Sequence, residues 1–166
     1  MSMDPTFLQL ITGITCLLTG LVAGLFYSYS CSVTGGLGKL PAREYLTAFQ
    51  AINKAILNPW FFAGFLGCLV ALPLSTWLAY RGGVQDAFHL LLASSAVYLF
   101  GVFGVTILGN VPLNEHVATL QADTLPEEEL AEERSLFERP WNKYNRIRTV
   151  ASTISFLLVI LAITWL

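Results

Sequence analysis

The sequence alternates long apolar runs with shorter polar segments, and this pattern predicts helices that cross a membrane. The four apolar runs are residues 7–30, 60–80, 87–109 and 147–166. Each has roughly the 20 residues that a helix needs to span a bilayer. Because a helix satisfies its own backbone hydrogen bonds in lipid, the pattern predicts an all-α, polytopic membrane protein. We expect residues 1–166 to form a single domain, a four-transmembrane-helix bundle.

The polar segment between the first two runs, residues 31–59, has a helical period of its own. Pro41 precedes apolar residues at three- and four-residue steps, namely Tyr45, Phe49, Ile52 and Ile56. Such steps place the apolar side chains on one face of a helix. The segment therefore predicts an amphipathic interfacial helix between transmembrane helices 1 and 2.

The polar segment between the third and fourth runs is longer and acidic. Thr124 and Pro126 are typical of a helix start, and glutamates follow at positions 127–129, 132 and 133. We therefore expect a short acidic helical loop between transmembrane helices 3 and 4. A run of like charges usually marks a solvated face, so a metal-collecting patch is the less favoured interpretation.

Charge is scarce and lies mostly in these two polar segments. Charged residues make up 12% of the chain, about half the share usual in soluble domains, which argues against a soluble or disordered protein. The net charge of −2 offers no basic surface to nucleic acid. Residues 31–59 and 110–148 hold 17 of the 20 charged residues, including eight of the nine lysines and arginines. The positive-inside rule then predicts an inner or plasma membrane protein with cytoplasmic polar loops and both termini outside.

Few residues are suited to metal, haem or transport chemistry. The three cysteines form no CxxC pair, which argues against a disulfide framework or a zinc site, so no metal ligands are assigned. His89 and His116 fall on opposite sides of the predicted membrane, so they cannot ligate one haem together. A single-histidine haem or copper site stays open. No ionisable residue lies near the midplane of a predicted span, which disfavours transport.

Amide and guanidinium side chains gather where the predicted helices meet the cytoplasm. Asn110 and Asn114 are four residues apart and share a helix face, and Asn145 and Arg146 belong to a polar stripe at the foot of the fourth helix. Such groups offer well-oriented hydrogen-bond donors to an oxygen anion or a carbonyl. We expect them to converge, together with Asn53, on one pocket at this end of the bundle.

Several short motifs occur in a characteristic order among the four apolar helices. They are Gln50-Ala-Ile-Asn53, Asn58-Pro59, Asn110-Val-Pro-Leu-Asn114 and Trp141-Asn-Lys-Tyr-Asn145-Arg-Ile-Arg148. In these motifs the chain resembles the anthrone oxygenase family over most of its length. The resemblance implies oxidation of an anthrone-like phenolic ring ketone by O2, without an obvious cofactor.

This chemistry assigns expected roles to the polar residues. Deprotonating such a substrate gives an electron-rich enolate that can reduce O2, so the site needs a base and donors for the enolate oxygen. His116 is the only histidine on the polar side and is the hypothetical base. The expected oxyanion donors are Asn110, Asn114, Asn145 and Arg146. The expected substrate-binding residues are Gln50, Asn53, Trp141, Asn142 and Arg148, although Trp141 also suits interfacial anchoring.

A second hypothesis is that the chain is a non-catalytic membrane protein that binds lipid, quinone or a protein partner. A third, less favoured hypothesis is that it is a haem or metal redox protein. Under the oxygenase hypothesis the partners are the lipid bilayer and a hydrophobic small-molecule substrate. Gly20-Leu-Val-Ala-Gly24 is a GxxxG motif, which leaves a homo-oligomer open, although packing within the bundle is the preferred interpretation.

Overall fold

The computed structural model describes residues 5–166, and its regular structure there is entirely helical. Four helical spans are long and apolar enough to cross a membrane: Thr6–Leu37, Pro59–Gly82, Gln85–Thr119 and Glu127–Ile163. The predicted all-α bundle of four transmembrane helices is therefore confirmed. Large apolar side chains such as Leu17, Phe100 and Leu108 are exposed on its outer surface, as lipid contact requires.

The first span is not one regular α-helix. α1 (Pro5–Ser28) continues through a π-helical segment, η1 (Tyr29–Val33), into the short α2 (Thr34–Leu37). α3 (Ala42–Ile56) follows and is the predicted amphipathic helix, with Tyr45, Leu46 and Phe49 buried on its inner face. The sequence period of this segment thus corresponds to one buried face.

The second span, α4 (Pro59–Gly82), begins and ends with recognisable caps. The Asn58 side-chain oxygen accepts hydrogen bonds from the backbone N–H groups of Trp60 and Phe61, at 3.0 and 3.1 Å, and Pro59 occupies the first turn. Gly83 ends the helix with a φ of 73°, a left-handed conformation that glycine adopts without steric cost. These caps explain why the chain turns sharply at both ends of α4.

The third span contains two π-helical segments, and the fourth is unusually long. α5 (Gln85–Val97) leads through η2 (Tyr98–Gly104) and η3 (Thr106–Asn110) into α6 (Val111–Thr119). α7 (Glu127–Ile163) is 37 residues long. The acidic segment is helical, as expected, but it forms the first turns of α7 rather than a separate loop helix. The only irregular connection left between the third and fourth spans is residues 120–126.

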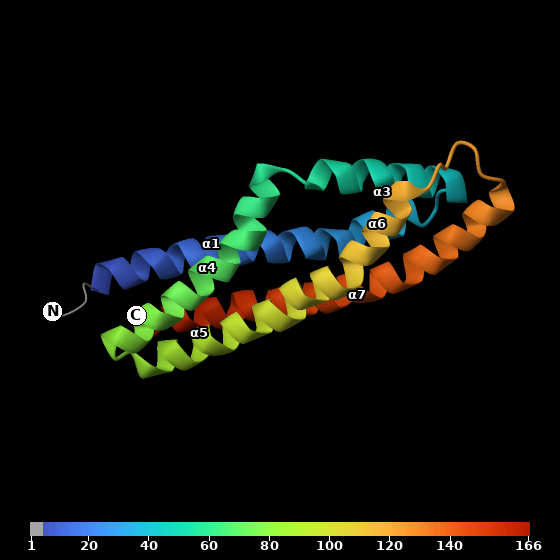
Figure 1. Ribbon diagram of the computed structural model, residues 1–166. Coiled ribbons are helices and arrows are strands. Elements are labelled where there is room, and N and C mark those ends of the chain that lie inside the picture. The colour runs from blue at the N-terminus through green and yellow to red at the C-terminus, as the bar shows by residue number, and fades with distance from the viewer. Residues whose placement is uncertain (1–4) are drawn as a thin grey trace.

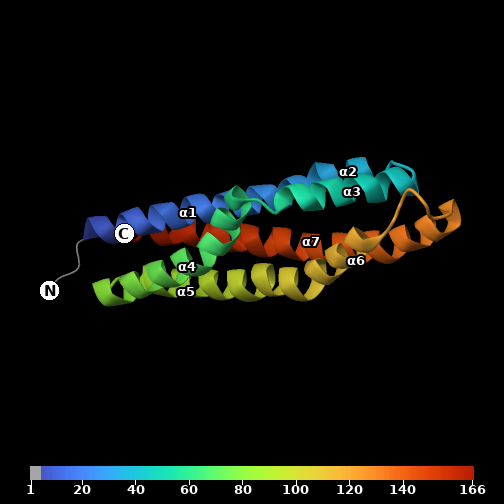
Figure 2. The ribbon, with the colours of Figure 1, turned by 45° about the horizontal axis from the view of Figure 1, so that its top comes forward.

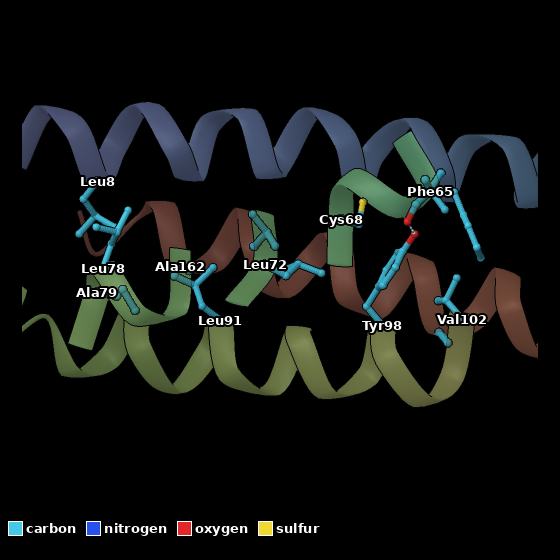
Figure 3. Packing of buried hydrophobic residues seen from close by; sticks show 14 of the residues in the cluster. Leu8, Phe65, Cys68, Leu72, Leu78, Ala79, Leu91, Tyr98, Val102 and Ala162 are labelled. Atoms are coloured by element: carbon cyan, nitrogen blue, oxygen red, sulfur yellow. Dashed lines mark hydrogen bonds between the residues drawn. The ribbon is translucent and has the colours of Figure 1, made fainter. Parts of the chain in front are cut away.

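The molecule is an elongated bundle with two packed regions. Figure 1 shows the C-terminus, the start of α1 and the α4–α5 turn at one end, while α3, α6 and the first half of α7 gather at the other. Figure 2 shows α1, α5 and α7 running along one another, while α4 runs obliquely from the α5 side of the bundle towards α3. In the membrane region, buried residues such as Leu72, Leu91 and Val102 fill the space between these helices (Figure 3). Because lipid tails are as apolar as these side chains, close van der Waals packing rather than the hydrophobic effect holds the helices together here.

The far end of the bundle, called here the polar end, has its own core of α3, α6 and α7 side chains around Tyr45, Phe49 and Phe137. Burial raises the pKa of the Tyr45 phenol, and nearby Glu138 adds to the rise while Arg134 opposes it. The phenol therefore stays neutral. Arg134 lies 4.5 Å from the Tyr45 ring centre and also donates to the Gly38 and Leu40 carbonyls, which ties α7 to the α2–α3 turn.

Glycines allow the third span to lie unusually close to α7. A Cβ atom on Gly101 would come within 2.7 Å of the Ala151 Cβ, and one on Gly109 within 2.8 Å of the Tyr144 ring. Small residues at such contacts let helix backbones approach in membranes. Of the GxxxG pair, Gly20 faces Phe156 of α7, whereas a Cβ on Gly24 would meet nothing within 4 Å. Gly20 thus serves packing within the bundle.

Candidate functional site

A cavity of about 200 Å³ lies at the boundary between the membrane region and the polar end. Its walls come from the end of α1 with η1, from α3, from the first turns of α4, from η2, η3 and α6, and from α7. Its lining residues are Leu25, Phe26, Tyr29, Phe49, Ile52, Asn53, Ile56, Leu57, Phe61, Phe62, Phe65, Leu66, Phe103, Thr106, Ile107, Val111, Asn114, Trp141, Asn145 and Arg148. An apolar cavity with a few convergent polar groups is the usual form of a small-molecule site.

Aromatic rings form much of the cavity wall. Phe61 and Phe65 stack with ring centres 5.2 Å apart, and Phe26 meets Phe65 edge to face at 6.5 Å. On the α3 and α7 side, Phe49 and Trp141 pack edge to face at 4.8 Å. Rings in mutual contact are held in place, so the wall offers preformed flat surfaces to an aromatic ligand.

Arg148 provides the charge of the cavity. Its side chain is buried, with 6% of the residue exposed, and its guanidinium lies 4.4 Å from the Phe26 ring centre and 5.4 Å from that of Trp141. Nη2 donates to the Asn145 side-chain oxygen at 3.0 Å, and Nη1 donates to the Thr106 hydroxyl at 3.4 Å. Nε is buried and has no hydrogen-bond partner. All the partners of this cation are therefore neutral.

Asn145 holds Arg148 in position. It is 1% exposed, its side-chain oxygen accepts from Arg148, and its amide group donates to the Ser30 hydroxyl at 2.9 Å. Ser30 in turn shares a hydrogen bond of 2.7 Å with Thr149. These bonds occupy both ends of the Asn145 amide and connect η1 to α7 beside the cavity.

The asparagines of the third span lie close to Trp141. Asn114 lines the cavity, and its side-chain oxygen accepts a hydrogen bond from the Trp141 indole N–H at 2.8 Å. Asn110 is fully buried next to the cavity, where its amide donates a long 3.5 Å bond to the Trp141 carbonyl and its oxygen has no partner. Asn53 lines the cavity from α3.

The structure thus brings some of the expected site residues together and places others elsewhere. Asn53, Asn114, Trp141, Asn145 and Arg148 line the cavity, whereas Asn110 is outside the lining and reaches it only through its bond to the Trp141 carbonyl. Four further expected residues are outside this lining, namely Gln50, His116, Asn142 and Arg146.

Each of these four has a different environment. Gln50 donates to the Val117 and Leu120 carbonyls, at 2.8 and 2.9 Å, and so ties α3 to the end of α6. The His116 imidazole pairs with Glu133 at 2.6 Å, and its side chain is 51% exposed. Asn142 and Arg146 line a separate groove beside η1 and α2. The expected convergence therefore applies to the asparagines but not to Arg146, because Arg146 and Arg148 point to different faces of α7.

Sequence reasoning missed the part of the cavity that comes from the first span. Phe26 and Tyr29 line it, and Ser30 orients Asn145. In the sequence these residues look like an ordinary apolar helix end. The π-helical segments η1 and η3 contain Tyr29 and Thr106, and such segments redirect side chains and are frequent at functional sites.

A family comparison covers most of this architecture. The anthrone oxygenase family model matches residues 45–158. The chain belongs to the anthrone oxygenase family. Comparison with curated proteins and with solved structures gave no match. In this anthrone oxygenase family member, the matched residues include every motif asparagine named above and Arg148, whereas the α1 and η1 wall lies before the matched range.

The donor set of the cavity is made of amides, hydroxyls, indole and guanidinium. Its lining contains no histidine, cysteine, aspartate or glutamate. Within residues 5–166, no group of three or more such side chains is arranged to hold a metal ion. The groups present are suited to hydrogen bonding and to compensating negative charge.

Proposed function

We propose that this protein is a membrane-embedded oxygenase that oxidises a flat, apolar aromatic ring ketone with O2. The observation that supports the proposal is a cavity whose walls are aromatic and whose polar end holds a buried guanidinium, in a member of the anthrone oxygenase family. An anthrone-like substrate fits this division, because its rings are apolar and the negative charge of its enolate gathers on one carbonyl oxygen.

The proposed reaction needs the enolate form of the substrate. Loss of one proton from the ring CH2 gives an enolate whose oxygen carries the negative charge. The enolate gives an electron pair to O2, a C–O bond forms, and the peroxide takes up a proton. Loss of water from the hydroperoxide leaves a second carbonyl, so one CH2 and one O2 become one C=O and one H2O.

The chain would act mainly by stabilising the enolate relative to the ketone. A cation held beside a developing oxyanion in a water-poor site is effective because it needs no reorganisation during the reaction. Arg148 lies in the cavity lining, whereas the His116 imidazole is engaged with Glu133 outside it. We therefore place the stabilising charge on Arg148 and propose that the substrate proton leaves to water at the cavity mouth.

The proposal is tested by measuring O2 consumption by the protein in the presence of a test substrate. Protein in lipid nanodiscs, supplied with anthrone, should consume O2 and form anthraquinone faster than empty nanodiscs, which report the spontaneous oxidation. We propose that O2 is the co-substrate and that no resident cofactor takes part, so the absorption spectrum of the purified protein should lack visible bands. A rate equal to that of empty nanodiscs would contradict the oxygenase. A haem spectrum or stoichiometric copper would contradict the cofactor-free reaction.

Ligand binding without turnover is the outcome that would favour the alternative function. If anthrone bound saturably while O2 uptake stayed at the level of empty nanodiscs, the cavity would belong to a non-catalytic binding protein for lipid, quinone or a related apolar molecule.

A further inference from the structure

We infer that the cavity is a receptor for an organic anion, in which the Arg148 guanidinium binds the ionised oxygen of a flat, apolar ligand. The inference deepens the proposed function, on which its link to catalysis rests, by specifying that the ligand binds as a phenolate, an enolate or a closely similar oxyanion. It assigns Arg148 the role of charge partner to the ligand.

Arg148 differs from the other buried or half-buried arginines in having no acidic partner. Arg43 pairs with Glu127 at 2.8 Å, and Arg134 pairs with Glu138 at 2.7 Å. Within residues 5–166, no carboxylate lies within ion-pair distance of Arg148, although it is the most buried of the three. A charge removed from water without a counter-charge is costly, so an anion that entered the cavity would be strongly favoured.

The contacts of the guanidinium leave several of its N–H donors unused and available to such an anion. The rings of Phe26 and Trp141 lie within cation–π distance, and rings of this kind supply electron density but no negative charge. Thr106 and Asn145 each take one hydrogen bond, and Nε has none. A guanidinium has five N–H donors, so most of its donor capacity is unused.

The rest of the cavity indicates what the anion is attached to. The wall rings described above favour a flat aromatic body over a flexible chain, since offset stacking and edge contacts act on rings. Apolar side chains at the rim, Leu57, Leu66 and Ile107, are each more than 40% exposed. An apolar rim of this kind favours entry of an apolar ligand over entry of a hydrophilic ligand.

Binding of two matched fluorescent probes tests the inference without any turnover. The first is 9-anthracenecarboxylate, which is ionised at pH 7.5, and the second is the neutral 9-anthracenemethanol. Each is titrated into protein in zwitterionic nanodiscs, with empty nanodiscs as background, and quenching of tryptophan emission is followed. We expect the wild type to bind the anion at least about tenfold more tightly than the alcohol, which corresponds to about 1.4 kcal/mol.

Two substitutions should remove this preference by different routes. Arg148→Met deletes the cation at similar volume. Asn145→Asp keeps the shape but supplies a carboxylate next to Nη2, so the guanidinium gains an internal counter-ion. Both variants should bind the two probes with affinities equal to within about threefold, while Arg148→Lys retains part of the preference. Lys143→Met, which removes an exposed positive charge from the same helix, serves as the control and should keep the full preference.

The outcomes separate this inference from the oxygenase proposal. Equal binding of both probes by the wild type, or a preference that persists in Arg148→Met, overturns the anion receptor even if anthrone is oxidised. A lost preference in both variants supports it even if O2 uptake is absent. Oleate is a competitor with the same charge and a flexible body. Displacement of the aromatic probe by oleate at equal concentration would overturn the aromatic assignment and identify a fatty-acid site.

Discussion

Arginines in protein interiors are ordinarily paired, because the desolvation of a guanidinium is offset only by an anion or by many hydrogen bonds. At Arg148 the neutral bonds to Thr106 and Asn145, together with two aromatic contacts, offset part of this cost. The protein without ligand therefore retains destabilising electrostatic free energy at this residue. Such residual strain is common where a side chain is kept for function rather than for stability.

This view predicts that Asn145→Asp stabilises the protein. The new carboxylate would lie about 3.0 Å from Arg148 Nη2 and would compensate its charge. We expect the free energy of unfolding to rise by about 1.5–3 kcal/mol, the range of hydrogen bonds to charged groups. Unfolding of the purified protein in mixed micelles, followed by circular dichroism at increasing denaturing detergent, measures the change.

The same substitution in an Arg148→Met background is its control. There the new carboxylate would be buried without a cation to compensate it, and Asn145→Asp should destabilise the protein instead. A stabilisation of equal size in both backgrounds would show that the effect does not come from the pairing with Arg148.

A second prediction at this scale concerns the hydrogen bond between Trp141 and Asn114. Asn114→Ala would leave the part-buried indole N–H without its acceptor at 2.8 Å, so we expect a loss of about 1–3 kcal/mol in the free energy of unfolding. In a Trp141→Phe background, which has no N–H to satisfy, Asn114→Ala should cost clearly less. Equal costs in the two backgrounds would mean that Asn114 acts through contacts other than this bond.

The sequence allowed the motif asparagines to be placed near one end of the bundle, because helical spacing and the lengths of the apolar runs determine depth. It did not reveal which of two nearby arginines turns inward. Arg146 and Arg148 are two residues apart on α7, so their side chains point about 200° apart around the helix. Only the packing of α7 against η1 and η3 decides that Arg148 is the buried one.

At the scale of elements, the cavity depends on departures from regular α-helix. The third span changes to π-helix over η2 and η3, and its glycines approach α7 at Ala151 and Tyr144. A π-helical turn accommodates extra residues and shifts the side chains that follow it. Hydrophobic periodicity detects the span but not these local changes, since both kinds of helix are equally apolar here. This explains why the spans were predictable and the part of the cavity wall that depends on the π-helical segments was not.

Gly101→Ala should disturb this close approach. The added methyl would lie 2.7 Å from the Ala151 Cβ, so one helix has to move, and overpacking of this kind costs about 1–3 kcal/mol. Gly13→Ala is the matched control, because a Cβ there meets nothing within 4 Å and alanine favours the helix. Both are measured by unfolding in mixed micelles.

Restoring the space should restore the packing. In an Ala151→Gly background the clash is absent, and Gly101→Ala should lose most of its cost. A cost that is the same with alanine or glycine at position 151 would show that the helix contact at Gly101 is not what limits this position.

At the scale of the whole molecule, the two ends of the bundle differ in charge: most charged residues lie at the polar end and few at the opposite end. Two arginines connect the segments of the polar end. Arg43 donates to backbone carbonyls within residues 120–126, and Arg134 donates to backbone carbonyls of the α2–α3 turn. The opposite end carries the α4–α5 turn, with Arg81 and Asp86 as its charges. The cavity lies near the polar end, so the orientation of the bundle decides which leaflet of the membrane supplies a ligand.

Orientation can be measured with single cysteines. The native cysteines at 16, 31 and 68 are replaced by alanine, and one cysteine is introduced at exposed Gln85, the first residue of α5, or at exposed Asp123, between α6 and α7. Positive charge is retained on the cytoplasmic side, and eight of nine lysines and arginines lie at the polar end. In intact cells an impermeant maleimide should therefore label Gln85→Cys at once, and Asp123→Cys only after permeabilisation. The reverse pattern would place the cavity at the outer leaflet. Labelling of both positions in intact cells would mean that the bundle does not cross the membrane as four spans.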